Sequence, residues 1–106
     1  MKRAAIYTRS AIAKDHNQRE RGEDYIAKMG WHCLPDRYDD NGYSGIKFDR
    51  PALQRLLRDV LSGKIDCVVV CDMARLSRSV SDLQQLVAIF EQHDVSLVFI
   101  SEETDQ

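Results

Sequence analysis

Arginines are the residues of this chain whose type and spacing best suit a binding or catalytic role. Four of them lie in or beside stretches that follow short apolar runs: Arg9, Arg50, Arg75 and Arg78. A guanidinium is planar and permanently charged, so several together suit a phosphate or the transition state of phosphoryl transfer. Taken alone, each arginine is more often a solvated surface residue. The functional interpretation therefore depends on whether the fold brings the four together.

A serine beside one of these arginines is the candidate nucleophile. Ser10 directly follows Arg9. A serine held near guanidinium groups can attack a phosphodiester and form a covalent phosphoserine that conserves the bond energy. The alternative is a loop or helix-capping serine, which is the more frequent role of any single serine.

Other combinations of reactive residues are weaker candidates. Cys67 and Cys71 are separated by three valines in an apolar run, which is typical of core thiols rather than zinc ligands. Gly42 and Gly45 are not followed by the residues of a phosphate-binding loop. The three histidines are scattered along the chain without a partner pattern. The residues therefore predict neither a metal centre nor a nucleotide-binding loop.

Four short apolar runs alternate with three amphipathic segments. We expect strands at 4–7, 33–38, 65–71 and 95–100, and helices over 18–29, from Pro51 to Gly63, and after a cap at Ser79 or Ser81. Short runs that are apolar throughout are typical of strands buried on both faces of a parallel sheet. The alternation predicts a three-layer α/β domain, with a mostly parallel central sheet flanked by helices.

The ends of the predicted strands position the candidate residues. Ligands of an open parallel sheet bind beyond the carboxyl ends of its strands. Polar stretches at 7–10, 39–50 and 75–78 follow the first three strands, and we expect them to be loops at one edge. The stretch 39–50 is long for a loop within a compact domain, which favours a functional role.

Length and charge limit the class of protein. The 106 residues carry a formal net charge of −2 and predict one domain. Neither a signal peptide nor an apolar run of the ~18–20 residues of a membrane span is visible. Three cysteines cannot all pair, so we expect a reducing cytoplasm. The slightly acidic balance argues against a small protein that coats DNA non-specifically.

The charge is unevenly distributed along the chain. Residues 1–19 hold five basic residues against one acidic residue, whereas residues 91–106 hold five acidic residues and no lysine or arginine. This asymmetry is a weak indication of an anionic partner near the basic end. The alternative is a solvated surface with uneven charge.

Several ordered stretches resemble the N-terminal catalytic domain of serine recombinases, the resolvases and invertases. They are AIYTR at 5–9, QRE at 18–20, YDDNGYSG at 38–45, DRPAL at 49–53, GKID at 63–66 and ARLSRS at 74–79. The resemblance runs over nearly the whole chain. Because several motifs occur in the family's order and at similar separations, it is far more specific than any one of them.

The resemblance implies a resolvase-like fold and a substrate of double-stranded DNA. Serine attack would give a 5′-phosphoserine link, and subunits of a dimer or tetramer would exchange and rejoin strands without a metal or nucleotide cofactor. It implies a bacterial, phage or mobile-element source. It also implies a catalytic domain over 1–106, followed in the family by a dimerisation helix and a DNA-binding domain. The implied active-site residues are Arg9, Arg50, Arg75 and Arg78, with Gln18 and Ser44 in support.

Two positions depart from the family pattern. After the first strand the family has Tyr-x-Arg-x-Ser, which places Ala11 at the serine position and Ser10 one residue early. Ala74 stands where the family often has an aspartate. Two interpretations stay open: Ser10 is the nucleophile of a recombinase, or the chain is a degenerate, non-catalytic module that binds DNA or a partner. A generic phosphate-binding or receiver-type domain has less support, because neither a phosphate loop nor an acidic trio is visible.

Overall fold

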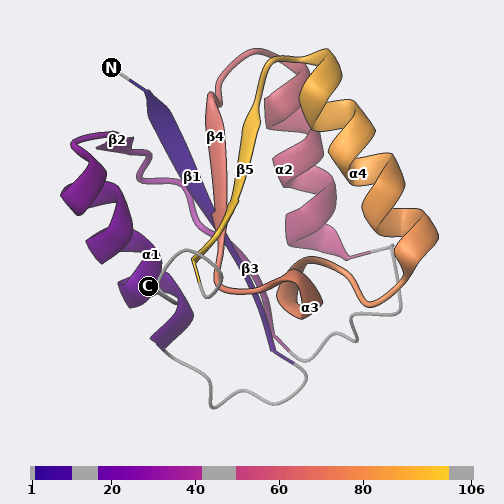
Figure 1. The fold of residues 1–106 in the computed structure, drawn as a ribbon, viewed down its shortest axis with the longest axis horizontal. Helices are drawn as coiled ribbons and strands as arrows, with labels where there is room; N and C mark the ends of the chain where they lie inside the picture. Colours follow the sequence, from indigo (N-terminus) through magenta and orange to yellow (C-terminus); the bar gives the residue numbers. More distant parts are fainter. Residues whose placement is uncertain (1, 11–16, 42–49, 101–106) are drawn as a thin grey trace.

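The computed structural model describes residues 2–10, 17–41 and 50–100 (Figure 1). Its elements, in chain order, are β1 Arg3–Ser10, α1 Asn17–Met29, β2 His32–Cys33, β3 Tyr38–Asn41, α2 Pro51–Leu61, β4 Cys67–Val70, α3 Met73–Leu76, α4 Val80–Gln92 and β5 Ser96–Phe99. Strands and helices alternate as the apolar pattern predicts, except that β2 is followed directly by β3 and α3 directly by α4.

All strand pairings among the described residues are parallel, which confirms the predicted sheet. β1 pairs with β4 on one side and with both β2 and β3 on the other, while β5 lies beyond β4. The strand predicted at 33–38 is wrong in its bounds, because two short strands occupy this side of β1. Pro35 lies between them and has no backbone N–H to donate to a ladder.

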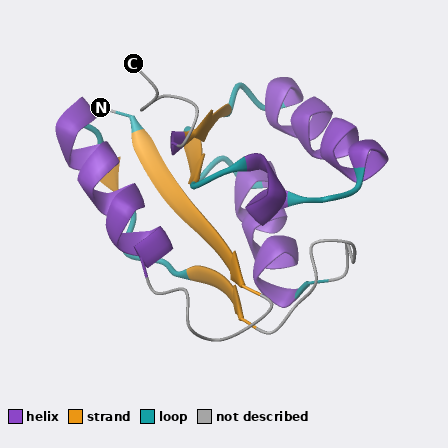
Figure 2. Ribbon diagram, turned by 60° about the horizontal axis from the view of Figure 1, so that its bottom comes forward, coloured by secondary structure: helices purple, strands orange, loops and turns teal. Residues whose placement is uncertain are grey.

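Helices cover both faces of the sheet (Figures 1 and 2). α1 lies on one face, and α2 and α4 lie on the other. Side chains alternate along β1 accordingly. Ala4 and Ile6 pack in the core with Ile26 of α1, whereas Ala5 and Tyr7 pack in the core beneath α2 and α4. The predicted three-layer α/β architecture is therefore confirmed.

Local signals define the helix ends as expected, with one choice now resolved. α1 is followed by Gly30, whose φ of 74° is the left-handed conformation that favours glycine after a helix. α2 begins at Pro51, where the missing N–H costs no helical hydrogen bond. Ser79, rather than Ser81, caps α4, and its hydroxyl accepts from the backbone N–H of Asp82.

Two of the predicted loops begin within strands, and the remainder of the loop predicted at 39–50, residues 42–49, lies outside the described residues. β1 continues through Ser10, and 38–41 is a strand rather than the start of a loop. Direct pairing explains both corrections: Thr8 lies opposite Asp39 in the ladder, and its hydroxyl donates to the Asp39 carboxylate at 2.6 Å. The third predicted loop, 75–78, begins inside α3.

No helix in the described part of the chain is long and apolar enough to cross a membrane.

Candidate active site

The carboxyl end of β1 is held by a side chain of α1. The Gln18 carboxamide accepts from the backbone N–H of Arg9 at 3.1 Å and donates to the Arg9 carbonyl at 3.0 Å. This amide binds both polar groups of one residue, as a neighbouring strand would. Gln18 is buried at the start of α1, so it fixes the backbone immediately before Ser10.

Arg9 points inward and holds α3. Its side chain is buried, and its guanidinium donates to the carbonyl oxygens of Ala74 at 2.8 Å and Arg75 at 3.2 Å. The last carbonyls of a helix have no partner within the helix. The charged donors of Arg9 therefore stabilise the C-terminal end of this short helix, where the helix dipole is negative.

Arg50 binds the same turn from the start of α2. It is 0% exposed, and its guanidinium donates to the Leu76 carbonyl and, at 3.0 Å, to the Tyr7 hydroxyl. Its guanidinium carbon lies 5.6 Å from the centre of the Tyr7 ring, within the range of a cation–π contact. Its Nε is buried without a hydrogen-bond partner among the described residues.

A buried carboxylate completes this network. Tyr7 donates its hydroxyl to Asp40 at 2.8 Å, and the Asp40 carboxylate also accepts from the N–H groups of Ala52 at 2.8 Å and Leu53 at 3.0 Å. These are free donors in the first turn of α2, which a carboxylate suits. Burial is the main cause that raises the pKa of Tyr7, against the opposing effect of Arg50. Tyr7 therefore stays protonated and links Arg50 to Asp40.

Arg75 and Arg78 are the more accessible members of the set. The Arg75 side chain is 31% exposed and its Nη1 lies 3.5 Å from the Arg9 carbonyl oxygen, while Arg78 is exposed. Burial is the main cause that lowers the pKa of Arg9, followed by the charge of Arg50. The charges of Arg75 and Arg78 lower it further, so the other three arginines all lie within electrostatic reach of Arg9.

This arrangement concentrates positive charge at one edge of the sheet. A guanidinium stays protonated in proteins, so the lowered pKa of Arg9 reflects its burial first and then repulsion by the neighbouring arginines, not neutralisation. An anion bound at this edge would relieve that repulsion. The buried pair, Arg9 and Arg50, binds backbone carbonyls, which leaves Arg75 and Arg78 better placed to reach a phosphate in solvent.

The predicted site residues are located as follows. All four arginines and Gln18 lie at the carboxyl edge, as expected from the topology. Ser10 pairs through its backbone with Asn41 at the end of β1. Ser44 and Ala11 lie outside the described residues.

Sequence reasoning missed Tyr7 and Asp40 as parts of the site. The signal for Tyr7 was its position two residues before Arg9, because residues two apart in a strand lie on the same face of the sheet. Asp40 lies within the polar stretch 39–50, where nothing in the sequence distinguishes it from Asp39 beside it. Among the described residues, no group of three or more His, Cys, Asp or Glu side chains could hold a metal ion.

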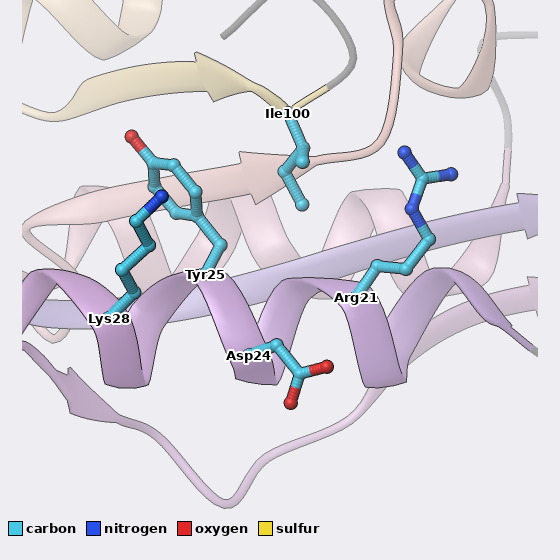
Figure 3. Close-up of a pocket in the computed structure, with 5 residues that line it drawn as sticks. All are labelled: Arg21, Asp24, Tyr25, Lys28 and Ile100. Atoms are coloured by element: carbon cyan, nitrogen blue, oxygen red, sulfur yellow. The ribbon is translucent and has the colours of Figure 1, made fainter. Parts of the chain in front are cut away.

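A separate hollow lies between α1 and the end of β5 (Figure 3). It is lined by Arg21, Asp24, Tyr25, Lys28 and Ile100. Figure 3 shows Tyr25 between Arg21 and Lys28, which also belong to α1. The hollow contains none of the four arginines and holds charges of both signs, so it is a weaker candidate for phosphate chemistry than the edge.

Comparisons with known proteins agree with this geometry. The family model "Resolvase, N terminal domain" matches residues 4–106. The crystal structure of the N-terminal catalytic domain of TP901-1 integrase is 37% identical, with a TM-score of 0.89 over 95% of this chain and 79% of that chain. The C-terminal catalytic domain of ISC1926 TnpA, an IS607-like serine recombinase, has the same fold at 22% identity, with a TM-score of 0.84 over 92% of this chain and 70% of that one.

A curated relative from Bacillus subtilis (strain 168), named "Putative DNA recombinase", is 34% identical over 67 residues. The match covers 63% of this chain but only 13% of that relative's length. Because the family model spans nearly the whole chain, the chain belongs to the resolvase N-terminal domain family, the catalytic domains of serine recombinases.

Proposed function

We propose that this chain is the catalytic domain of a site-specific recombinase that cleaves and rejoins double-stranded DNA. The Ser10 Oγ attacks the scissile phosphorus, and the bond from phosphorus to the 3′ oxygen breaks. The serine hydroxyl gives up its proton to water and the departing 3′ oxygen takes one up from water, which leaves a 5′-phosphoserine link and a free 3′-hydroxyl. Attack by the 3′-hydroxyl of another strand on the phosphoserine then rejoins DNA and releases the serine.

The observation that carries this proposal is the convergence of four arginines beside the end of β1. Phosphoryl transfer places negative charge on the phosphate oxygens, and preorganised guanidinium groups stabilise that charge. In the proposed mechanism, Arg75 and Arg78 contact the phosphate. Arg9 and Arg50 contribute positive charge from their buried positions and hold α3 through its Ala74, Arg75 and Leu76 carbonyls.

The whole protein's behaviour belongs to the same proposal. Recombination of two duplexes needs more than one active site, so the protein would act as a dimer or tetramer on DNA. A mobile element as its source and the cytoplasm as its location are consistent with a DNA substrate. Net charge does not oppose this, because the positive charge that matters is local to the edge.

The alternative is a non-catalytic module that keeps the arginine edge and binds DNA or a partner. Ala11, at the serine position of the family pattern, favours this alternative. The two proposals share the electrostatics of the edge and differ only in whether a hydroxyl reaches the phosphate.

A covalent adduct distinguishes them. The full-length protein is incubated with a plasmid that carries the DNA flanking its own reading frame, denatured in detergent, and examined for DNA-linked protein. Ser10→Ala is compared with Ser62→Ala, which removes an exposed hydroxyl at the far end of α2. We expect an adduct with the wild type and with Ser62→Ala but not with Ser10→Ala.

Two other outcomes contradict this expectation. An adduct that survives Ser10→Ala would exclude Ser10 as the nucleophile. Binding to the plasmid without an adduct in any of the proteins would favour the non-catalytic module.

A further inference from the structure

Besides the buried Asp40, a partly exposed carboxylate, that of Asp72, lies beside Arg75 at the edge. Asp72 directly precedes α3, and its carboxylate accepts from the backbone N–H of Arg75 at 3.1 Å. Its other oxygen lies 3.9 Å from the Arg75 Nε. The Asp72 and Arg75 side chains are 41% and 31% exposed, so water reaches both.

The same short helix is held at its other end by the buried arginines. Arg9 donates to its Ala74 and Arg75 carbonyls, and Arg50 donates to Leu76. α3 therefore has charged partners at both ends, with Asp72 at the N-terminal end where a carboxylate is favourable. A helix of four residues has little stability of its own, so these partners decide its position.

A carboxylate at this place also works against the binding of DNA. An exposed ion pair at 3.9 Å adds little to folding stability. Its negative charge, close to the arginine that would contact a phosphate, repels that phosphate. Asp72 thus lowers affinity for DNA while it restricts the orientations of Arg75.

We propose that Asp72 is a positioning residue that holds α3 and the Arg75 guanidinium in the orientation needed for phosphoryl transfer. This inference rests on the proposed function. Asp72 acts through Arg75 and does not itself contact the phosphate. Loss of its charge should therefore separate binding from chemistry, because the site attracts DNA more strongly and orients Arg75 less well.

The informative variant is Asp72→Asn. Asparagine caps a helix about as well as aspartate, so the hydrogen bond to the Arg75 N–H persists while the charge is lost. We expect DNA affinity to rise about twofold to fivefold at low salt. We expect the single-turnover cleavage rate to fall about 10- to 100-fold in the full-length protein.

A second measurement needs no cleavage. Nitrogen-15 NMR of residues 1–106 follows the Arg75 Nε–H, whose exchange with water should accelerate in Asp72→Asn. Asp82→Asn is the matched control, since Asp82 lies in the first turn of the neighbouring helix α4. The control should leave the Arg75 signal, the DNA affinity and the cleavage rate unchanged.

The outcomes separate this inference from the proposed function. An unchanged Arg75 signal in Asp72→Asn would overturn the positioning role, and so would a parallel loss of affinity, rate and thermal stability. If the wild type forms no adduct with DNA, the proposed function fails, and the NMR comparison still decides whether Asp72 orders Arg75.

Discussion

The Tyr7 hydroxyl joins two buried charges, and its removal tests whether the network organises the edge. Tyr7→Phe keeps the buried ring and its contact with Arg50 but deletes the oxygen that accepts from Arg50 at 3.0 Å and donates to Asp40 at 2.8 Å. Arg50 already has one buried nitrogen without a partner among the described residues. The substitution would leave a second donor unsatisfied beside it.

The expected loss of stability follows from these two bonds. A hydrogen bond to a charged group contributes about 1.5–3 kcal/mol to the free energy of unfolding. Buried groups that lose their partner cannot form a replacement hydrogen bond with water. Two such bonds give a loss of roughly 3–6 kcal/mol for Tyr7→Phe. That is a large part of the ~5–15 kcal/mol by which a domain of this size is stable.

Tyr38→Phe is the matched control on the neighbouring strand. Its ring is also 0% exposed, and its hydroxyl donates to Asp59 at 2.6 Å. In Tyr38→Phe, Asp59 would still have its ion pair with Lys64 at 3.9 Å and is partly accessible to water. We therefore expect a smaller loss of stability, roughly 1–2 kcal/mol. Urea unfolding of the three proteins measures both values. A loss in Tyr7→Phe no larger than that in Tyr38→Phe would refute the argument that this hydroxyl links buried charges.

Three further predictions concern surface charge, acid stability and thiol reactivity. Arg78→Ala should abolish adduct formation while the thermal midpoint shifts by no more than about 2 °C, since Arg78 is exposed. The control Arg58→Ala, also at an exposed position, should leave both adduct formation and the thermal midpoint unchanged. Hydrogen bonds from Arg3 lower the pKa of Asp66 to about 2, below its ordinary 3.8. The stability that Asp66 contributes is therefore present above about pH 4 and is lost as the pH falls toward 2. Urea midpoints of Asp66→Asn should therefore lie below those of the wild type near pH 5 and converge with them near pH 2; a constant difference would contradict this. Burial raises the pKa of Cys67 to about 11, so iodoacetamide at about pH 8 should label the partly exposed Cys33 first, as read by peptide mass spectrometry, and early labelling of Cys67 would be the opposite result.

The apolar pattern was sufficient to predict the layers of this fold. Strands β1, β4 and β5 coincide with runs of apolar residues, and α2 presents Leu53, Leu56 and Val60 to the core at helical spacing. Where polar residues continue a strand, the pattern fails. Thr8 and Asp39 read as loop residues in isolation, and only their pairing across two parallel strands keeps both in the sheet.

The position of the site could be predicted, but which of its arginines are buried and which are accessible could not. Parallel topology alone brings Arg9, Arg50 and Arg75 to one edge. That the first two are buried depends on the carbonyls of α3, a helix whose four residues have no periodicity to detect. Asp40 likewise gains its role from the free N–H groups of α2, which a sequence pattern does not place opposite it.

The proposed function requires that Ser10 become covalently linked to the 5′ end of cleaved DNA. The most direct measurement is mass spectrometry of the trapped protein–DNA complex after digestion with protease and nuclease. We expect a nucleotide phosphate on the peptide that contains Ser10, together with DNA ends that carry a free 3′-hydroxyl. A nucleotide attached to Ser44 or to another residue, or a link through the 3′ end of the DNA, would contradict the account.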